Sequence, residues 1–196
     1  SYRRIRWDAP APTITIRNDC IASQRNVHPG RLLSDGTYSD ARVLTPLELM
    51  ILDSLPADWN IPDDTPELLI RQCIGESIPP LMLKRIVQGI DLEDDYYMKN
   101  NEKIKAISLF SSAGIGELLL HNVEVIAGNE ILPKRAECYR HFYPHAEMVC
   151  GDILDDSIKE RLINIVKENN VKMLLATPPC QGLSTLGKNK GQAHYE

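Results

Sequence analysis

The sequence lacks long apolar runs, paired cysteines and any excess of positive charge. No run approaches the roughly 18 residues that a membrane-spanning helix requires, and the stretch Ser1 to Arg4 lacks the apolar core of a signal peptide. The five cysteines, at positions 20, 73, 138, 150 and 180, form no C-x-x-C pair and no metal-ligand spacing with the five histidines. We therefore expect a cytoplasmic protein with reduced thiols, without a membrane partner and without a bound metal.

The charge balance is slightly acidic. The 22 lysines and arginines are outnumbered by 27 aspartates and glutamates, so the formal net charge is −5. This argues against strong binding of duplex nucleic acid by this chain alone, because cationic contacts with phosphates dominate such binding. With 43% hydrophobic and 25% charged residues over 196 positions, the composition is typical of a folded domain with one good core.

A charged run without apolar periodicity divides the chain at residues 91–103. Such a composition indicates a solvated linker. We therefore expect a first unit at residues 1–90 and a second unit at residues 104–196.

In the second unit, short apolar strands alternate with helical patterns. This alternation predicts parallel βαβ units in a Rossmann-like α/β sheet. The expected strands cover residues 104–110, 123–127, 148–149 and 173–176, and the expected helices begin at 117–120 and cover 133–142 and 157–168.

The first unit carries weaker signals. Residues 12–16 form a strand candidate, and Thr45 caps an expected helix through a capping box with Glu48. We expect Arg42 and Glu48 to form a structural ion pair there. A second helix should start near Pro79 and bury a group of apolar side chains, namely Leu81, Leu83, Ile86 and Val87.

Three consecutive strand ends carry residues suited to a nucleoside ligand. The loop from Phe110 to Gly116 uses small residues that let backbone approach a ligand at a helix amino end; a plain strand-to-helix turn is the alternative. Glu130 ends the second strand, where nucleoside-binding folds place a carboxylate for the ribose hydroxyls. Asp152 follows the third strand and is placed to accept a hydrogen bond from an adenine amino group.

The run Pro178-Pro179-Cys180-Gln181 follows the apolar strand candidate at residues 173–176. A thiol on a stiff turn at the carboxyl edge of a parallel sheet lies where α/β enzymes place reacting groups. The sequence therefore predicts chemistry at Cys180. A buried, unreactive cysteine is the alternative, and we assign the other four cysteines to that class.

Taken together, the motifs at 108–114, 129–130, 151–153 and 178–181 resemble the cytosine-C5 DNA methyltransferases in content and spacing. The first unit resembles the last two motifs of the same family, through residues 7–15, 28–31, 42–48 and 74–80. In the usual order these motifs follow the others, whereas here they come first. The resemblance therefore implies a Rossmann-like S-adenosylmethionine-dependent methyltransferase sheet that is circularly permuted and incomplete.

The resemblance also assigns roles. It implies that S-adenosyl-L-methionine is the cofactor and that duplex DNA is the substrate. Cys180 is the expected nucleophile, adding to cytosine C6 so that C5 can accept the methyl group. Ile131 stands where an aromatic residue is common, and Glu76 stands where Asn is common. The implied cofactor contacts are Phe110, Ser111, Ala113, Gly114, Glu130, Ile131, Asp152, Ile153, Pro179, Glu76 and Ile78, and the expected DNA-contacting loop supplies Gln181, Ser184, Lys188 and Lys190.

The family's Glu-Asn-Val motif, its Arg-containing motif and its target-recognition region are not found in these 196 residues. A flipped cytosine must be held on its Watson–Crick edge, so we expect a missing C-terminal region or a complementing polypeptide. The leading interpretation is a DNA (cytosine-5-)-methyltransferase of restriction–modification type, associated with the prokaryotic nucleoid. An RNA cytosine-C5 methyltransferase and a non-catalytic cofactor-binding scaffold remain open as alternatives.

Overall fold

Four parallel strands form a single sheet in the order β3-β2-β1-β4. The computed structural model describes residues 2–21, 27–56, 58–90 and 102–179. The strands are β1 (Ile104–Leu109), β2 (Val123–Glu130), β3 (Glu147–Cys150) and β4 (Met173–Ala176). All four expected strands are confirmed, and the second and third are longer than the sequence pattern predicts. The protein is therefore α/β, as expected.

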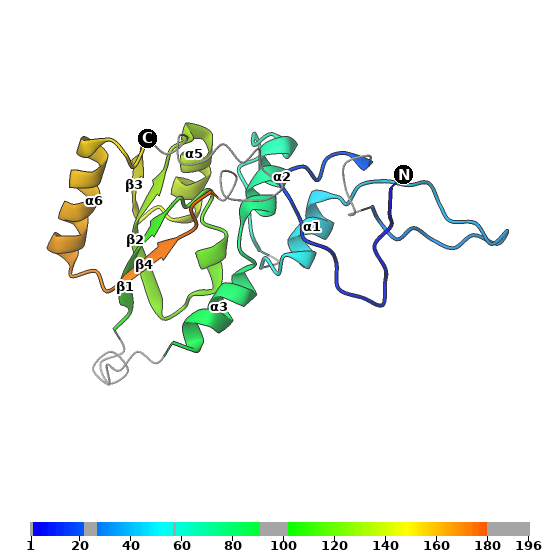
Figure 1. Ribbon diagram of the computed structural model, residues 1–196, viewed down its shortest axis with the longest axis horizontal. Helices are drawn as coiled ribbons and strands as arrows, with labels where there is room; N and C mark the ends of the chain where they lie inside the picture. Colours follow the sequence, from blue (N-terminus) through cyan, green and yellow to red (C-terminus); the bar gives the residue numbers. More distant parts are fainter. Residues whose placement is uncertain (1, 22–26, 57, 91–101, 180–196) are drawn as a thin grey trace, which may run out of the picture.

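Helices connect these strands and cover the sheet (Figure 1). α5 (Pro133–Phe142) joins β2 to β3, and α6 (Asp156–Asn169) joins β3 to β4. α6 buries Leu162 and Ile165 against one sheet face. The connection from β1 to β2 is a single 3-10 helix, η2 (Gly116–Leu119), rather than the start of a longer helix. It is short because Leu120 must turn inward, 6% exposed, before the chain enters β2 at Val123.

Three helices lie in the first unit: α1 (Pro46–Leu52), α2 (Glu67–Glu76) and α3 (Pro80–Gln88). The capping box of α1 is confirmed, since Thr45 Oγ1 accepts from the Glu48 amide and Glu48 accepts from the Thr45 amide. The sequence pattern did not predict α2. α3 begins as predicted and points Val87 and Leu83 inward, but the expected burial of Leu81 and Ile86 is wrong, since they are 46% and 49% exposed.

The strand predicted at residues 12–16 is also wrong, because this segment is irregular. Its backbone lies directly against α2, where a Cβ on Gly75 would come within 2.3 Å of the Thr15 carbonyl oxygen. Asn18 Nδ2 donates to that same carbonyl at 2.8 Å. The Thr15 carbonyl thus has a side-chain partner beside a helix instead of a partner in a sheet ladder, which satisfies it as well as a strand would.

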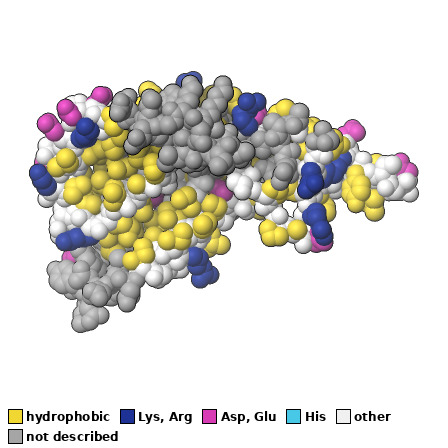
Figure 2. Space-filling model, viewed as in Figure 1, with side chains coloured by type: hydrophobic (Ala, Val, Ile, Leu, Met, Phe, Trp, Pro, Cys, Tyr) yellow, Lys and Arg dark blue, Asp and Glu magenta, His cyan; other side chains and the backbone are white. Residues whose placement is uncertain are grey.

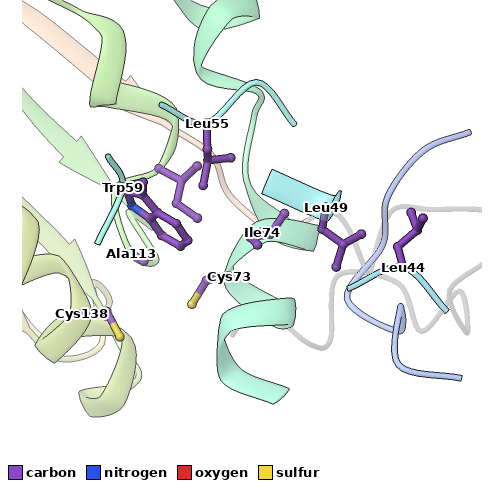
Figure 3. Packing of buried hydrophobic residues seen from close by; sticks show 9 residues of the cluster. Leu44, Leu49, Leu55, Trp59, Cys73, Ile74, Ala113 and Cys138 are labelled. Carbon is purple, nitrogen blue, oxygen red and sulfur yellow. The ribbon is translucent and has the colours of Figure 1, made fainter. Parts of the chain in front are cut away.

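Hydrophobic packing joins the two units. Leu49, Trp59 and Ile74 from the first unit pack in one cluster with Ala113 and Ile115, and Figure 3 shows most of this cluster. A second cluster places Val87 of α3 against Ala106 and Val123 of the sheet. The division at residues 91–103 stays a prediction, and most of that stretch lies outside the described residues.

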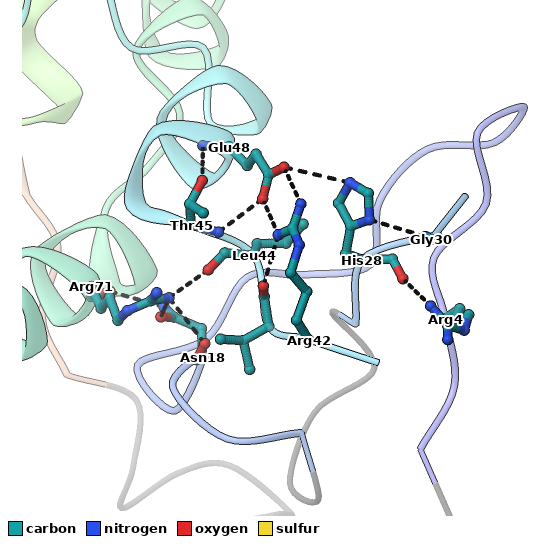
Figure 4. Close-up of polar contacts among 10 residues, drawn as sticks. Arg4, Asn18, His28, Gly30, Arg42, Leu44, Thr45, Glu48 and Arg71 are labelled. Atoms are coloured by element: carbon teal, nitrogen blue, oxygen red, sulfur yellow. Dashed lines mark hydrogen bonds and ion pairs between the residues drawn. The ribbon is translucent and has the colours of Figure 1, made fainter. Parts of the chain in front are cut away.

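Polar contacts hold the irregular part of the first unit (Figure 4). The Arg71 guanidinium, 6% exposed, donates to the Leu44 carbonyl at 2.8 Å and to Glu67 at 2.8 Å. The expected Arg42–Glu48 ion pair is confirmed, with contacts of 2.7 and 2.8 Å. Both arginines act as structural crosslinks, and the buried Arg71 needs its acceptors because a buried cation is tolerated only when acceptors surround it. No helix among the described residues is long and apolar enough to cross a membrane.

The buried side chain of Asp53 links the carboxyl end of α1 to the carboxyl end of α2. Its side chain accepts a hydrogen bond from Ser77 Oγ at 2.7 Å and is 5% exposed. Burial raises the pKa of Asp53 from 3.8 to about 6, although the Ser77 bond lowers it. The unfolded chain releases this proton first, so stability falls as pH rises from about 4 to 6 and stays reduced above that window.

We expect Asp53→Asn to raise the free energy of unfolding by about 1–2 kcal/mol near pH 7.5, because the amide carries no charge to bury. Urea unfolding at several pH values measures this change. The exposed Asp63→Asn is the control and should have little effect. A lower stability of Asp53→Asn at neutral pH would contradict the prediction.

Candidate active site

The carboxyl ends of all four strands meet at one edge of the sheet. In the register, Leu109 lies beside both Asn129 and Ala176, and Glu130 lies beside Cys150. This brings together the loop at 110–116, Glu130, Asp152 and the segment at 177–179. The strand ends therefore lie together, as the sequence pattern predicts, and their role as one binding site stays a prediction.

The loop after β1 has an unusual backbone. Phe110, Ser112 and Gly114 have φ angles of 56°, 47° and 71°, so every second residue is left-handed. Two of these residues carry a Cβ, and such a conformation costs of order 1 kcal/mol at each. The Ser111 amide and hydroxyl both donate to the Asn129 carbonyl, at 2.9 and 3.1 Å. The strained loop is therefore fixed to the end of β2.

The Glu130 side chain holds the loop in place. Its carboxylate is 5% exposed and accepts from the Ser112 amide and the Leu132 amide, each at 2.9 Å. One side chain thereby positions the loop and the entry into α5. A carboxylate oxygen has two lone pairs, so each oxygen retains the capacity to accept a second donor.

Gly114 is required by packing as well as by backbone conformation. A Cβ at this position would come within 2.4 Å of the Tyr143 ring and 2.9 Å of the Tyr139 ring. Tyr143 Oη donates to the Gly114 carbonyl at 2.7 Å, and the two tyrosine rings stack with centroids 4.7 Å apart. The sequence analysis explained the small residues of this loop by close approach of a ligand. At Gly114 the missing side chain also leaves room for the two tyrosine rings.

A hydrogen bond between side chains joins the two ends of the loop. The Ser108 hydroxyl, on β1, donates to the carboxylate of Glu117, on η2. Burial raises the pKa of Glu117. The pair joins both ends of the loop, and sequence reasoning missed it because neither residue forms a recognisable motif.

The remaining predicted contacts surround this loop. Asp152 Oδ1 accepts from the Leu154 amide at 2.9 Å, which shapes the turn after β3. Ile153 packs with the α6 core, and Ile131 is 55% exposed beside Glu130. Ile78 lies near Gly116, with its carbonyl oxygen 3.5 Å from the position of a Cβ there. Pro179, at the end of the described chain, is exposed.

Sequence reasoning missed two positioning residues at this edge. Asn129 Nδ2 donates to the carbonyls of Val149 and Gly151, at 2.9 and 3.1 Å, and so joins β2 to the turn after β3. Thr177 Oγ1 donates to the Phe110 carbonyl at 3.1 Å, which joins the end of β4 to the loop. A polar residue at the end of an apolar strand was the available signal in both cases.

Glu76 and Arg135 bring the first unit to the same region. Glu76 ends α2, Arg135 lies in the first turn of α5, and their side chains form a two-point ion pair.

The predicted nucleophile and DNA-contacting residues lie outside the described part of the chain, so their roles stay predictions. They are Cys180, Gln181, Ser184, Lys188 and Lys190. Within the described part of the chain, no group of three or more His, Cys, Asp or Glu residues is arranged to hold a metal.

Replacing Glu130 with Gln should loosen the loop. The amide offers one accepting oxygen, so the Ser112 or Leu132 amide loses its partner in a buried position. We expect a loss of about 2 kcal/mol in unfolding free energy, with faster hydrogen exchange at these amides measured by NMR. Glu124→Gln, at an exposed position of the same strand, is the control. Unchanged protection of both amides would show that Glu130 does not hold the loop.

Comparison with known proteins identifies the family of this chain. Residues 1–91 and 104–196 match the family described as C-5 cytosine-specific DNA methylase. The Type II methyltransferase M1.HgaI of Avibacterium volantium is 74% identical over 90 residues, which are 46% of this chain and 25% of that protein. The chain thus spans about a quarter of the length of this relative. Because the family match covers both units, the chain belongs to the C-5 cytosine-specific DNA methylase family.

Proposed function

We propose that this chain is the cofactor-binding and nucleophile-bearing part of a DNA (cytosine-5-)-methyltransferase of restriction–modification type. The observation that carries the proposal is the meeting of the loop at 110–116, Glu130 and Asp152 at the edge where the chain continues to Pro179 and Cys180. Family membership and the name of the relative support the reaction type. The proposed location is the cytoplasm, at the nucleoid.

The described residues fit S-adenosyl-L-methionine, which supplies an electrophilic methyl group when bound. Glu130 has lone pairs for the ribose hydroxyls, and Asp152 lies at the next strand end for the adenine amino group. The exposed Ile131 offers an apolar surface for the purine. Arg135 Nε is buried without a hydrogen-bond partner among the described residues. A buried polar atom of this kind is normally hydrogen-bonded, so it is a donor that a bound ligand can use.

The proposed chemistry belongs to Cys180. Its thiolate Sγ adds to C6 of a flipped cytosine, and the electron pair moves through the ring so that C5 can take the methyl group. Loss of the C5 proton then expels the thiolate and restores the ring. The hydrogen bond from Thr177 to Phe110 supports this role, because it fixes the residue before Pro178 and Pro179 against the loop at 110–116. Gln181, Ser184, Lys188 and Lys190 are the proposed contacts with DNA.

The packing of α3 supports a circularly permuted order of the family motifs. α3 lies along η2 and buries Val87 against Ala106 and Val123, so a helix of the first unit covers part of the sheet of the second. Short linkers can join such neighbouring ends without rearranging a fold. The chain order thus places the closing elements of the fold ahead of its first strand.

The free side of β4 supports a complementing polypeptide. Among the described residues, β4 pairs with β1 on one side and with no strand on the other. Its residues Met-Leu-Leu-Ala are all apolar, as in a strand buried on both faces, yet Leu174 is 58% exposed. Figure 2 shows a broad hydrophobic area between α6 and α3 on this face. A further parallel strand with its helix would bury it.

Leu174→Lys should therefore block completion of the fold. We expect the chain to form a complex with a polypeptide that carries the family motifs missing from this chain, measured by light scattering, and the lysine variant to bind at least about tenfold more weakly. Leu47→Lys, on α1 and similarly exposed at 62%, is the control. Equal binding by both variants, or association of the chain with itself through β4, would contradict the prediction.

Cys180→Ser should abolish covalent capture of DNA. The completed assembly is incubated with S-adenosyl-L-methionine and a duplex that contains 5-fluorocytosine, and the adduct is detected by denaturing electrophoresis. Cys20→Ser, which changes a partly exposed thiol of the first unit, should leave the adduct intact. Methyl incorporation into transfer RNA is measured in parallel, and methylation of transfer RNA instead of duplex DNA would favour the RNA alternative. Methylation by Cys180→Ser would refute the nucleophile and favour the scaffold interpretation.

A further inference from the structure

An ion pair joins the two units beside the candidate cofactor site. Arg135 Nη2 donates to Glu76 Oε1 at 2.8 Å, and Nη1 lies 2.6 Å from Oε2. The residues are 59 positions apart, one at the end of α2 and the other at the start of α5. Such a two-point contact fixes orientation as well as distance.

This pair is more covered than a similar pair elsewhere. The side chains of Arg135 and Glu76 are 16% and 25% exposed, whereas those of the bidentate pair Arg161–Glu147 are 45% and 44% exposed. Arg135 Nε is in addition buried without a hydrogen-bond partner among the described residues. Solvent screens the Arg135–Glu76 pair less, so its charges act more strongly on their surroundings.

The groups around Glu76 define its charge. Arg135 faces it from α5, Glu130 from the end of β2, and Cys73 from its own helix. Burial raises the pKa of Glu76, Arg135 lowers it, and the charge of Glu130 raises it. Burial also raises the pKa of the Cys73 thiol to about 12, so this group stays neutral. With both glutamates ionised, the two carboxylates and one guanidinium leave a net negative charge.

We propose that Arg135 is a positioning residue for the cofactor: its guanidinium holds the Glu76 carboxylate of the first unit in place to accept from the ammonium group of S-adenosyl-L-methionine. This rests on the proposed function. The cofactor's ammonium and sulfonium are both cationic, and the net negative charge of Glu76, Arg135 and Glu130 attracts them. The pair thereby makes the first unit part of the site formed by the second.

Binding of S-adenosyl-L-methionine to the full chain, without DNA, tests the proposal by titration calorimetry. We expect Arg135→Gln and Glu76→Gln each to weaken binding about tenfold, and the double variant to bind no more weakly than either single variant, because the two residues act as one unit. Arg135→Lys should recover part of the loss, since the charge remains without the two-point geometry. Arg161→Gln should bind as the unmodified chain does.

The pH dependence separates positioning from a purely structural role. Without Arg135, burial and Glu130 leave Glu76 easier to protonate, so Arg135→Gln should lose further affinity as pH falls from about 7 to 5.5. The unmodified chain and the double variant should show no comparable change over this window. A structural role would instead lower affinity in parallel with the urea midpoint at every pH.

Two results would overturn the proposal. Unchanged affinity in both Arg135→Gln and Glu76→Gln would show that the first unit does not complete this cofactor site, while leaving the proposed function intact. Weaker binding by Arg135→Gln with the same pH profile as the unmodified chain would assign Arg135 to stability alone. The unmodified chain is titrated first, because a failure to bind the cofactor there would refute the proposed function itself.

Discussion

The two hydrogen bonds accepted by the Glu130 carboxylate hold the site together. They fix the Ser112 amide in a left-handed loop and the Leu132 amide at the entry to α5. Other parts of the site are placed relative to these two segments: Tyr139 of α5 and Tyr143, which directly follows this helix, pack on Gly114, and Arg135 of α5 reaches Glu76. A buried carboxylate can do this because backbone amides stabilise its charge.

Much of the second unit could be predicted because its signals are local. The alternation of apolar strands and helices predicted β1, β2, β3 and β4 with short errors at the ends. The capping box at Thr45 likewise predicted α1. Residues 12–16 failed because a β-rich composition does not reveal that Thr15 lies against Gly75 of a helix. α2 was missed because its stability comes from packing Cys73 and Ile74 into a core shared between the units.

The strand-end residues of the site could also be predicted, since parallel strands bring their carboxyl ends to one edge. The sequence did not reveal what holds them. Ser108 with Glu117, Thr177 with Phe110, and Arg135 with Glu76 are contacts between segments, and they depend on how the chain returns to itself. The packing role of Gly114 was hidden for the same reason, because the two tyrosines that contact it lie in α5 and directly after it.

The central position of β1 has a consequence for the order of folding. β1 pairs with β2 soon after it in the chain, but its other partner, β4, is reached only 67 residues later, where Leu109 meets Ala176. Closing so long a loop costs conformational entropy before the pairing returns any stability, and such non-local contacts slow folding. The half-sheet of β1, β2 and β3 can therefore assemble first, leaving attachment of β4 as the late step that completes the edge where the site lies.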